Sequence, residues 1–367
     1  MNGKNASEQH GGNVFAAIRK TGIQSANILD FSANINPLGL ANSALQAIHN
    51  SLSNIVHYPD PNAFDLKETI SAHYQVPTTS ITVGNGAVEL LYILCHMKKP
   101  RKVLTPAPTF SEYSRAANAC GASVQYFYLS ANNNFYIDTD AIAENLDGID
   151  IVFICNPNNP TGTLMTNQQI KVLLDAAQKT NTLVVVDESF TDFLPDASSY
   201  TCRKLLSSYA NLVIIHSLTK FYAIPGLRLG FALASSDITQ NLHKGKDPWN
   251  VNTLSQAVGI SALNDQAYQI ASRLFMQNSQ QDLWEKLSTL NNLFLYPPTV
   301  NYMLVNIGAT GITSTLLREF MMTKGILIRD CSNYPGLNSE YIRLAVKTPE
   351  HHNQLLSTLK EALGEIS

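Results

Sequence analysis

Directly after a short apolar run, the chain reads Ser217-Leu-Thr-Lys220-Phe-Tyr-Ala-Ile-Pro-Gly226-Leu-Arg228-Leu-Gly230. The apolar run, Leu212-Val-Ile-Ile215, predicts a buried strand, so we expect Lys220 to be poorly solvated just past its end. Burial lowers the pKa of a lysine below its free value of roughly 10.4, and a neutral amine attacks carbonyl groups. Ser217 and Arg228 add a hydroxyl and a fixed cation, which suit a phosphate.

This stretch therefore favours a lysine that forms a Schiff base with an aldehyde cofactor carrying a phosphate, namely pyridoxal phosphate. The alternative is a surface loop that happens to contain one lysine and one arginine.

The composition of the chain argues against several classes of protein. The 367 residues are enough for a large core and for two domains. A formal net charge of −3 and a charged fraction of 14% argue against nucleic acid or a membrane surface as a partner. The five cysteines are far apart and form no C-x-x-C pair, which predicts reduced thiols and no metal site. Because residues 1–10 lack the apolar core of a signal peptide and no apolar run could span a bilayer, we expect a cytoplasmic enzyme.

Between about residue 80 and residue 235, strand-like runs alternate with helix-like runs. The strands are predicted at 102–105, 123–129, 149–155, 182–186, 211–215 and 229–233. Helical patterns lie between them, as at 88–95 and 166–177. Near-continuous Val/Ile runs that alternate with helices indicate an α/β fold with a mostly parallel sheet buried on both faces.

The pattern changes after about residue 250, where it becomes more helical and ends with two short strand candidates, 302–305 and 341–346, and a last helix. This predicts a smaller α+β domain. We expect three parts: an N-terminal segment at 1–45 that packs with the small domain, a large cofactor-binding domain at 46–250, and a small C-terminal domain at 251–367.

Polar residues follow the predicted strands at the edge where open α/β sheets bind ligands. Burying the carboxylate of Asp187 is costly without a cationic partner such as a protonated pyridine nitrogen; the alternative is a helix cap or a structural salt bridge. Asn159 precedes Pro-Thr-Gly, so its amide either donates to a ring oxygen of the cofactor or belongs to an ordinary turn. Gly84-Asn-Gly86 precedes a predicted helix, whose first N–H groups would bind a phosphate, although such a glycine pair is usually only a turn.

Together these features resemble the fold-type I, pyridoxal-phosphate-dependent aminotransferase superfamily along essentially the whole chain. The resemblance rests on the Asn-Pro-Thr-Gly motif that begins at Asn159, on Asp187-Glu188 after a valine run, and on the Ser-x-x-Lys motif that ends at Lys220, with an arginine eight positions later. It implies a large domain with a mostly parallel sheet and a smaller C-terminal α+β domain.

The resemblance also implies a role for each matching residue. Lys220 would be the Schiff-base lysine, and Asp187 would pair with the pyridine nitrogen. The cofactor-binding residues would be Gly86, Ala87, Phe110, Asn159, Asp187, Ser217, Lys220, Arg228 and Tyr58, with Phe110 stacked on the ring. Tyr58 would reach the cofactor phosphate of a neighbouring subunit, which implies a homodimer with shared active sites. Arg343 would bind the α-carboxylate of the substrate bidentately.

Two groups within the superfamily match further motifs. Histidinol-phosphate aminotransferases share the Tyr-Pro-Asp motif and the Asn-Pro-Asn-Asn-Pro-Thr-Gly motif. The chain also contains His10-Gly-Gly-Asn13, the stretch 30–39, Pro248-Trp-Asn-Val-Asn252 and Asn333-Tyr-Pro-Gly-Leu337, which closely resemble threonine-phosphate decarboxylases of cobalamin biosynthesis. Phe190 favours the decarboxylases, because aminotransferases usually have a tyrosine three residues after the aspartate.

This second resemblance implies contacts with a phospho-amino acid substrate from His10, Gly11, Asn34, Asn159, Arg329 and Arg343. His10 and Arg329 carry charges suited to a phosphate or a carboxylate. The alternatives are a loose N-terminal tail for His10 and a structural role for Arg329.

The implied reaction is decarboxylation of L-threonine O-3-phosphate, or of L-serine O-phosphate, to aminopropanol phosphate or ethanolamine phosphate. One methyl group is worth only about 1–3 kcal/mol of discrimination in a pocket, so both substrates remain candidates. A histidinol-phosphate-type aminotransferase and a catalytically silent cofactor-binding relative are the alternatives, since decarboxylation and transamination use the same cofactor site.

Overall fold

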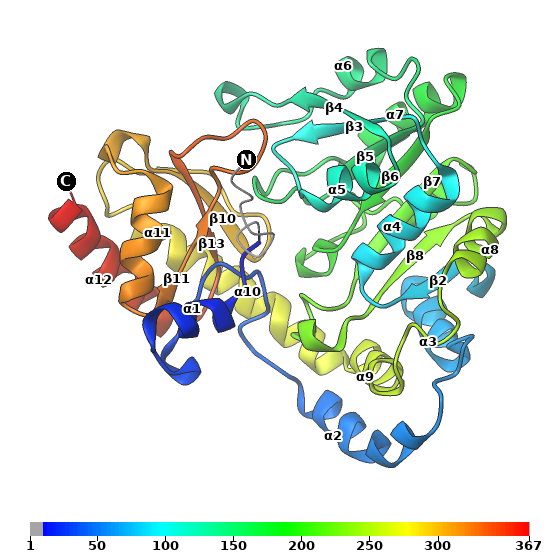
Figure 1. Ribbon diagram of the computed structural model, residues 1–367, viewed down its shortest axis with the longest axis horizontal. Helices are drawn as coiled ribbons and strands as arrows, with labels where there is room; N and C mark the ends of the chain where they lie inside the picture. The colour runs from blue at the N-terminus through cyan, green and yellow to red at the C-terminus, as the bar shows by residue number, and fades with distance from the viewer. Residues whose placement is uncertain (1–9, 367) are drawn as a thin grey trace. The chain divides into compact units, whose positions relative to one another are not determined.

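The computed structural model of the protein describes residues 10–366, which divide into two compact units (Figure 1). The larger unit consists of residues 38–159 and 163–273. The smaller unit contains, of the described residues, 10–37, 160–162 and 274–366. The boundary near residue 273 lies within the long helix α10 (Gln266–Leu287) rather than near residue 250, because helix α9 (Thr253–Asn264) packs on helices α2 (Asn42–Ser51) and α3 (Phe64–Tyr74) of the larger unit.

The larger unit is built on a seven-stranded sheet with the order β2-β8-β7-β6-β5-β3-β4. Its strands are β2 (Ile81–Gly84), β3 (Lys102–Ala107), β4 (Ser123–Tyr128), β5 (Ile151–Cys155), β6 (Leu183–Asp187), β7 (Leu212–Ser217) and β8 (Gly230–Ala234). Only β8 is antiparallel to its neighbours β2 and β7, so the prediction of a mostly parallel α/β sheet is confirmed. Strand β2 is not among the predicted strands, because its four residues are too few to form a recognisable apolar run.

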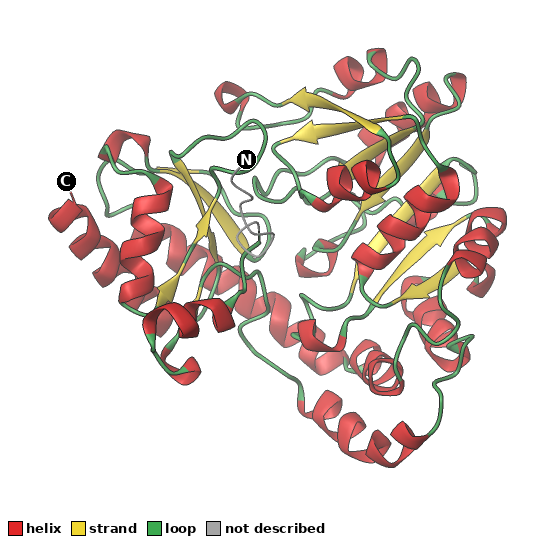
Figure 2. Ribbon diagram, viewed as in Figure 1, coloured by secondary structure: helices red, strands yellow, loops and turns green. Residues whose placement is uncertain are grey.

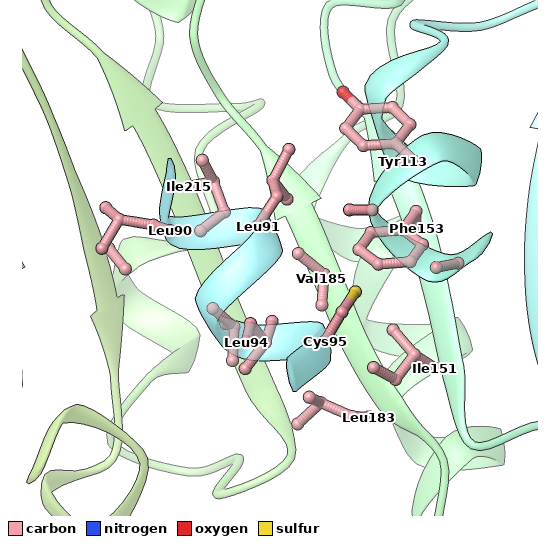
Figure 3. Close-up of a cluster of buried hydrophobic side chains, with 14 of the residues drawn as sticks. Leu90, Leu91, Leu94, Cys95, Tyr113, Ile151, Phe153, Leu183, Val185 and Ile215 are labelled. Atoms are coloured by element: carbon pink, nitrogen blue, oxygen red, sulfur yellow. The ribbon is translucent and has the colours of Figure 1, made fainter. Parts of the chain in front are cut away.

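Helices flank this sheet in Figure 2. They are α4 (Ala87–Lys98), α5 (Glu112–Ala119), α6 (Thr139–Glu144), α7 (Asn167–Lys179) and α8 (Ser236–Gly245). On one face, leucines of α4 pack on alternate residues of the central strands, as Figure 3 shows for Leu91, Leu94, Ile151 and Val185. The intervening strand residues point to the other face and are also buried, so the sheet is covered on both sides.

The smaller unit contains a four-stranded antiparallel sheet with the order β12-β13-β10-β9. Its strands are β9 (Phe294–Leu295), β10 (Tyr302–Asn306), β12 (Arg329–Asp330) and β13 (Tyr341–Ala345). A separate parallel pair, β1 (Leu29–Asp30) with β11 (Ile326–Leu327), joins the first part of the chain to the last. The helices of this unit are α1 (Val14–Thr21), α11 (Ser314–Thr323), α12 (Pro349–Ile366) and the second part of α10.

Within residues 10–366, no helix combines the length and the apolar character that crossing a membrane requires.

Candidate active site

The start of helix α4 is shaped to receive an anion. Gly86 is its N-cap with a φ of 86°, a conformation that glycine adopts without strain. A Cβ atom on Gly86 would lie 2.6 Å from Nη2 of Arg228, so the guanidinium packs directly on this turn. The positive end of helix α4 and the guanidinium of Arg228 therefore meet at the turn formed by Gly86, as a phosphate site requires.

Strands β7 and β8 bring the other predicted phosphate ligands to this place. Ser217, at the end of β7, pairs with Gly230 of β8. A Cβ atom on Gly230 would lie only 2.5 Å from the backbone nitrogen of Ala87, so the two segments are in contact. The structure thus gathers Gly86, Ala87, Ser217 and Arg228 at one corner of the larger unit.

Asp187 ends the neighbouring strand β6, and its side chain is buried. Tyr113 donates its hydroxyl to Oδ2 at 2.8 Å, and the backbone N–H of Ser189 donates to Oδ1 at 2.9 Å. No lysine, arginine or histidine among the described residues forms an ion pair with this carboxylate, and it caps no helix. A buried carboxylate held by two neutral donors fits a protonated pyridine nitrogen, which would supply the missing positive charge.

The loops after β3 and β5 meet beside Asp187, since Cys155 pairs with Asp187 across strands β5 and β6. The side-chain amide of Asn158 donates to the carbonyl of Pro108 at 3.0 Å, and the Thr109 hydroxyl donates back to Asn158 at 2.7 Å. These two hydrogen bonds hold the buried Asn159 near the loop that carries Phe110. The ring of Phe110 in turn lies edge-on to Tyr113, with centroids 5.6 Å apart.

Lys220 lies in the turn that follows β7. It is only partly buried, whereas the sequence analysis expects poor solvation; the neighbouring Thr219 and Phe221 are buried instead. The chain turns back at this point, with the N–H of Ile224 bonded to the carbonyl of Thr219 at 3.1 Å. Phe190 is buried, and its ring stacks on Phe193.

Sequence reasoning missed a buried polar cluster beneath these loops. Nε2 of His216 lies 2.9 Å from Oδ2 of Asp192, and the hydroxyl of Tyr74 reaches the same oxygen at 3.1 Å. Burial opposes ionisation of Asp192, but His216, His73 and Arg203 together outweigh burial and lower the pKa of Asp192 to about 2. Tyr113 was missed as well; its position three residues after Phe110 is the only local signal, because its partner is 74 residues away.

In the smaller unit, two buried arginines lie directly opposite each other. Arg329 of β12 pairs in register with Arg343 of β13, and their exposed fractions are 6% and 5%. Arg329 donates to Oδ1 of Asn333 at 2.8 Å, and Arg343 donates to the carbonyl of Ser32 at 2.6 Å. Like charges opposite each other on adjacent strands are destabilising, and anionic ligands would relieve that repulsion.

The predicted N-terminal contacts belong to this same unit. A cavity of about 200 Å³ is lined by His10, Gly11, Ser32 and Arg329, among others. His10 therefore lines the same cavity as Arg329. Asn34 is buried, and its Oδ1 has no hydrogen-bond partner among the described residues, which leaves this oxygen for a ligand.

Tyr58 is exposed, unlike the other predicted cofactor-binding residues except Arg228. Its exposed fraction is 78%, and its ring stacks on Trp249 with centroids 4.5 Å apart.

Comparison with known proteins agrees with this geometry. Residues 26–359 match the family "Aminotransferase class I and II". The chain is 36% identical to the threonine-phosphate decarboxylase of Salmonella typhimurium, over 98% of this chain and 97% of that protein.

Two solved structures are also similar. The histidinol-phosphate aminotransferase of Clostridium acetobutylicum has 30% identity and a TM-score of 0.86, covering 92% of this chain and 99% of that one. The L-threonine-O-3-phosphate decarboxylase of Porphyromonas gingivalis has 25% identity and a TM-score of 0.81, covering 91% and 99%. The resemblance found in the sequence is thereby confirmed: the chain belongs to the aminotransferase class I and II family and has the fold-type I architecture.

Proposed function

We propose that the protein is a pyridoxal-phosphate-dependent decarboxylase of a phosphorylated hydroxy-amino acid, either L-threonine O-3-phosphate or L-serine O-phosphate. Its product, aminopropanol phosphate or ethanolamine phosphate, would become the linker in the nucleotide loop of cobalamin. The observation that carries the proposal is the in-register pair of buried arginines, Arg329 and Arg343. Two adjacent guanidiniums fit a substrate with two anionic groups, one carboxylate and one phosphate.

The cofactor is pyridoxal 5'-phosphate, which when bound supplies a sink for the electrons of the bond that breaks at Cα. Lys220 would hold its aldehyde carbon, and Asp187 would keep the pyridine nitrogen protonated. Phe110 would stack on the ring, and the amide of Asn159 would donate to the ring oxygen. The phosphate would lie against Gly86, Ala87, Ser217 and Arg228. Gly86 packs on Arg228, and Gly230, the strand partner of Ser217, packs on Ala87.

Substrate binding falls to the smaller unit in this proposal, together with Asn159. Arg343 would grip the carboxylate bidentately and hold it out of the plane of the cofactor ring, so that the bond to CO₂ breaks rather than the Cα–H bond. His10 and Arg329 would bind the phosphate, with Gly11 and Asn34 beside them. After CO₂ leaves, Lys220 or a nearby water would return a proton to Cα.

A histidinol-phosphate-type aminotransferase is the second candidate, favoured by the structural similarity already described. Phe190 argues against an aminotransferase, because this buried ring has no hydroxyl to donate to the cofactor. A catalytically silent relative is disfavoured because Lys220, Asp187 and Arg343 are all present.

The deciding experiment is incubation of the purified protein with each phospho-amino acid, scoring release of CO₂ against formation of a keto acid. The proposal expects CO₂ from threonine phosphate or serine phosphate. Rapid amino transfer from histidinol phosphate to 2-oxoglutarate, without CO₂ from either phospho-amino acid, would refute it.

We further propose that the protein acts as a homodimer, in which Tyr58 reaches the cofactor phosphate of the partner. The exposure of Tyr58 and of its stacking partner Trp249 supports this proposal. Further exposed apolar side chains occur in the same part of the chain: Leu52, Ile55, Val56 and Phe64. Sedimentation should show a dimer, and Tyr58→Phe should weaken cofactor retention; a monomer with full activity would contradict the proposal.

A location in the cytoplasm is also part of the proposal. It is supported by the five free cysteines, four of which are buried, since a reducing compartment keeps thiols in this form.

A further inference from the structure

Ser32 is a junction in the smaller unit. Its hydroxyl donates to Oδ1 of Asp30 at 2.6 Å and accepts the backbone N–H of Gly12 at 2.8 Å. Its own N–H donates to the same Asp30 oxygen at 2.8 Å. Because Ser32 is buried and fixed from both sides, its carbonyl group has a defined direction.

That carbonyl touches two predicted substrate-binding elements at once. Arg343 donates Nη2 to the Ser32 oxygen at 2.6 Å. A Cβ atom on Gly11 would lie 2.0 Å from the same oxygen and 2.7 Å from its carbon. Glycine is therefore the residue that lets the N-terminal segment lie against the carbonyl that holds the arginine.

The orientation of Arg343 is sensitive to this carbonyl. A guanidinium is planar, so a hydrogen bond at one Nη atom fixes the direction of the whole fork toward a carboxylate. The group also lies over the ring of Tyr302, with 5.5 Å from Cζ to the ring centroid. A shift of the Ser32 carbonyl would therefore rotate the guanidinium of Arg343, which lies between the Ser32 oxygen and the Tyr302 ring.

We propose that Gly11 and Ser32 form a latch through which the segment His10–Gly12 sets the orientation of Arg343. The latch rests on the proposed function in one respect, namely that Arg343 binds the carboxylate of the substrate. Gly11 then acts as a positioning residue as well as lying near the substrate. The N-terminal segment thereby serves both anionic ends, the phosphate through His10 and the carboxylate through the latch.

The first test compares Gly11→Ala and Ser32→Ala with the matched control Gly364→Ala, whose new Cβ would meet nothing within 4 Å. A turned guanidinium misplaces the carboxylate, so we expect kcat for CO₂ release to fall at least about tenfold in Gly11→Ala. The absorbance of the lysine-bound cofactor should not change, because its ligands lie in the larger unit. Wild-type kcat in both variants, or a rise in KM alone, would overturn the latch.

A double-mutant cycle makes the test specific for Arg343. If Gly11 acts through that arginine, adding Gly11→Ala to Arg343→Lys should cost no more than about twofold beyond Arg343→Lys alone. His10→Ala serves as the contrast. It acts at the phosphate end of the substrate, so its fold-loss of activity should multiply with the fold-loss caused by Arg343→Lys. If the fold-loss of activity caused by Gly11→Ala also multiplies with that of Arg343→Lys, the latch is wrong.

Failure of the latch and failure of the proposed function give different experimental results. If the wild-type protein transfers amino groups and releases no CO₂, the decarboxylase proposal fails. The same cycle is then measured on amino transfer to 2-oxoglutarate, whose carboxylate also needs an arginine fork. Coupling between Gly11 and Arg343 in that reaction supports the latch, and independent losses overturn it.

Discussion

The two units satisfy their buried charges in opposite ways. In the larger unit, the carboxylate of Asp187 accepts hydrogen bonds from two neutral donors, Tyr113 and Ser189. In the smaller unit, Arg329 and Arg343 place two positive charges opposite each other. Neutral donors orient a charge without cancelling it, which suits a ligand that stays bound. Two buried guanidiniums on adjacent strands attract anions, which suits a substrate with two anionic groups. This difference supports the proposal that the larger unit holds the cofactor and the smaller one binds the substrate.

The largest effect should come from Lys220→Ala in the larger unit. Without the amine, the cofactor has no covalent attachment, so activity should fall on the order of 10³-fold or more. The visible absorbance of the bound cofactor should disappear on dialysis. In the wild-type protein, borohydride should fix the cofactor to the peptide that contains Lys220; labelling of a different lysine would show that the assignment is wrong.

Arg343→Lys should impair substrate binding and turnover but leave cofactor binding in the larger unit unchanged. An ammonium group cannot reproduce the bidentate fork that fixes the carboxylate torsion, so kcat/KM should fall by about 10²-fold. Steady-state kinetics measure the loss, and the cofactor absorbance should stay unchanged. A loss of cofactor in this variant would contradict the proposal that the larger unit holds the cofactor and the smaller unit binds the substrate.

A protein that lacks residues 1–12 should lose substrate affinity or turnover but keep its cofactor. The removed stretch includes His10, and its proposed hydrogen bond to the substrate phosphate would be worth about 1.5–3 kcal/mol, so KM should rise about tenfold or more. Kinetics with threonine phosphate and an absorbance spectrum test both halves of this expectation. Wild-type kinetics in the shortened protein would leave His10 without a role.

Tyr113→Phe should destabilise the larger unit. The change removes the hydroxyl that donates to Oδ2 of Asp187 and leaves a buried charge with one donor fewer. The free energy of unfolding should fall by about 1.5–3 kcal/mol, as measured by urea denaturation, with little change in KM for the substrate. An unchanged midpoint would show that the hydroxyl is not needed to hold Asp187.

An effect of similar size concerns Asp192 and is visible as a pH dependence. Burial raises the pKa of Asp192, but His216, His73 and Arg203 together lower it from 3.8 to about 2, so these contacts add stability above about pH 4 that is lost as the pH falls through 2. Asp192→Asn should therefore cost about 2 kcal/mol of unfolding free energy at neutral pH. The gap between variant and wild type should close as the pH approaches 2; a gap that does not depend on pH would contradict this account.

Local periodicity in the chain was enough to predict much of the larger unit. All six predicted strands are present, with ends shifted by a few residues, because buried parallel strands need continuous apolar runs. The cofactor residues follow the ends of those strands, and parallel strands bring their carboxyl ends to one edge of the sheet. Asp187 lies on the strand beside the one that ends at Ser217, and both residues come at the carboxyl ends of their strands.

The remaining features depend on register and on contacts between distant residues. Arg329 faces Arg343 only because β12 and β13 pair at that register, and a shift of one residue would put one of them on the opposite face. Tyr113 and Asp187 are 74 residues apart, and Ser32 and Arg343 are 311 apart. No pattern of neighbouring residues encodes such pairs; close packing of whole elements in three dimensions selects them, and with them the latch at Gly11.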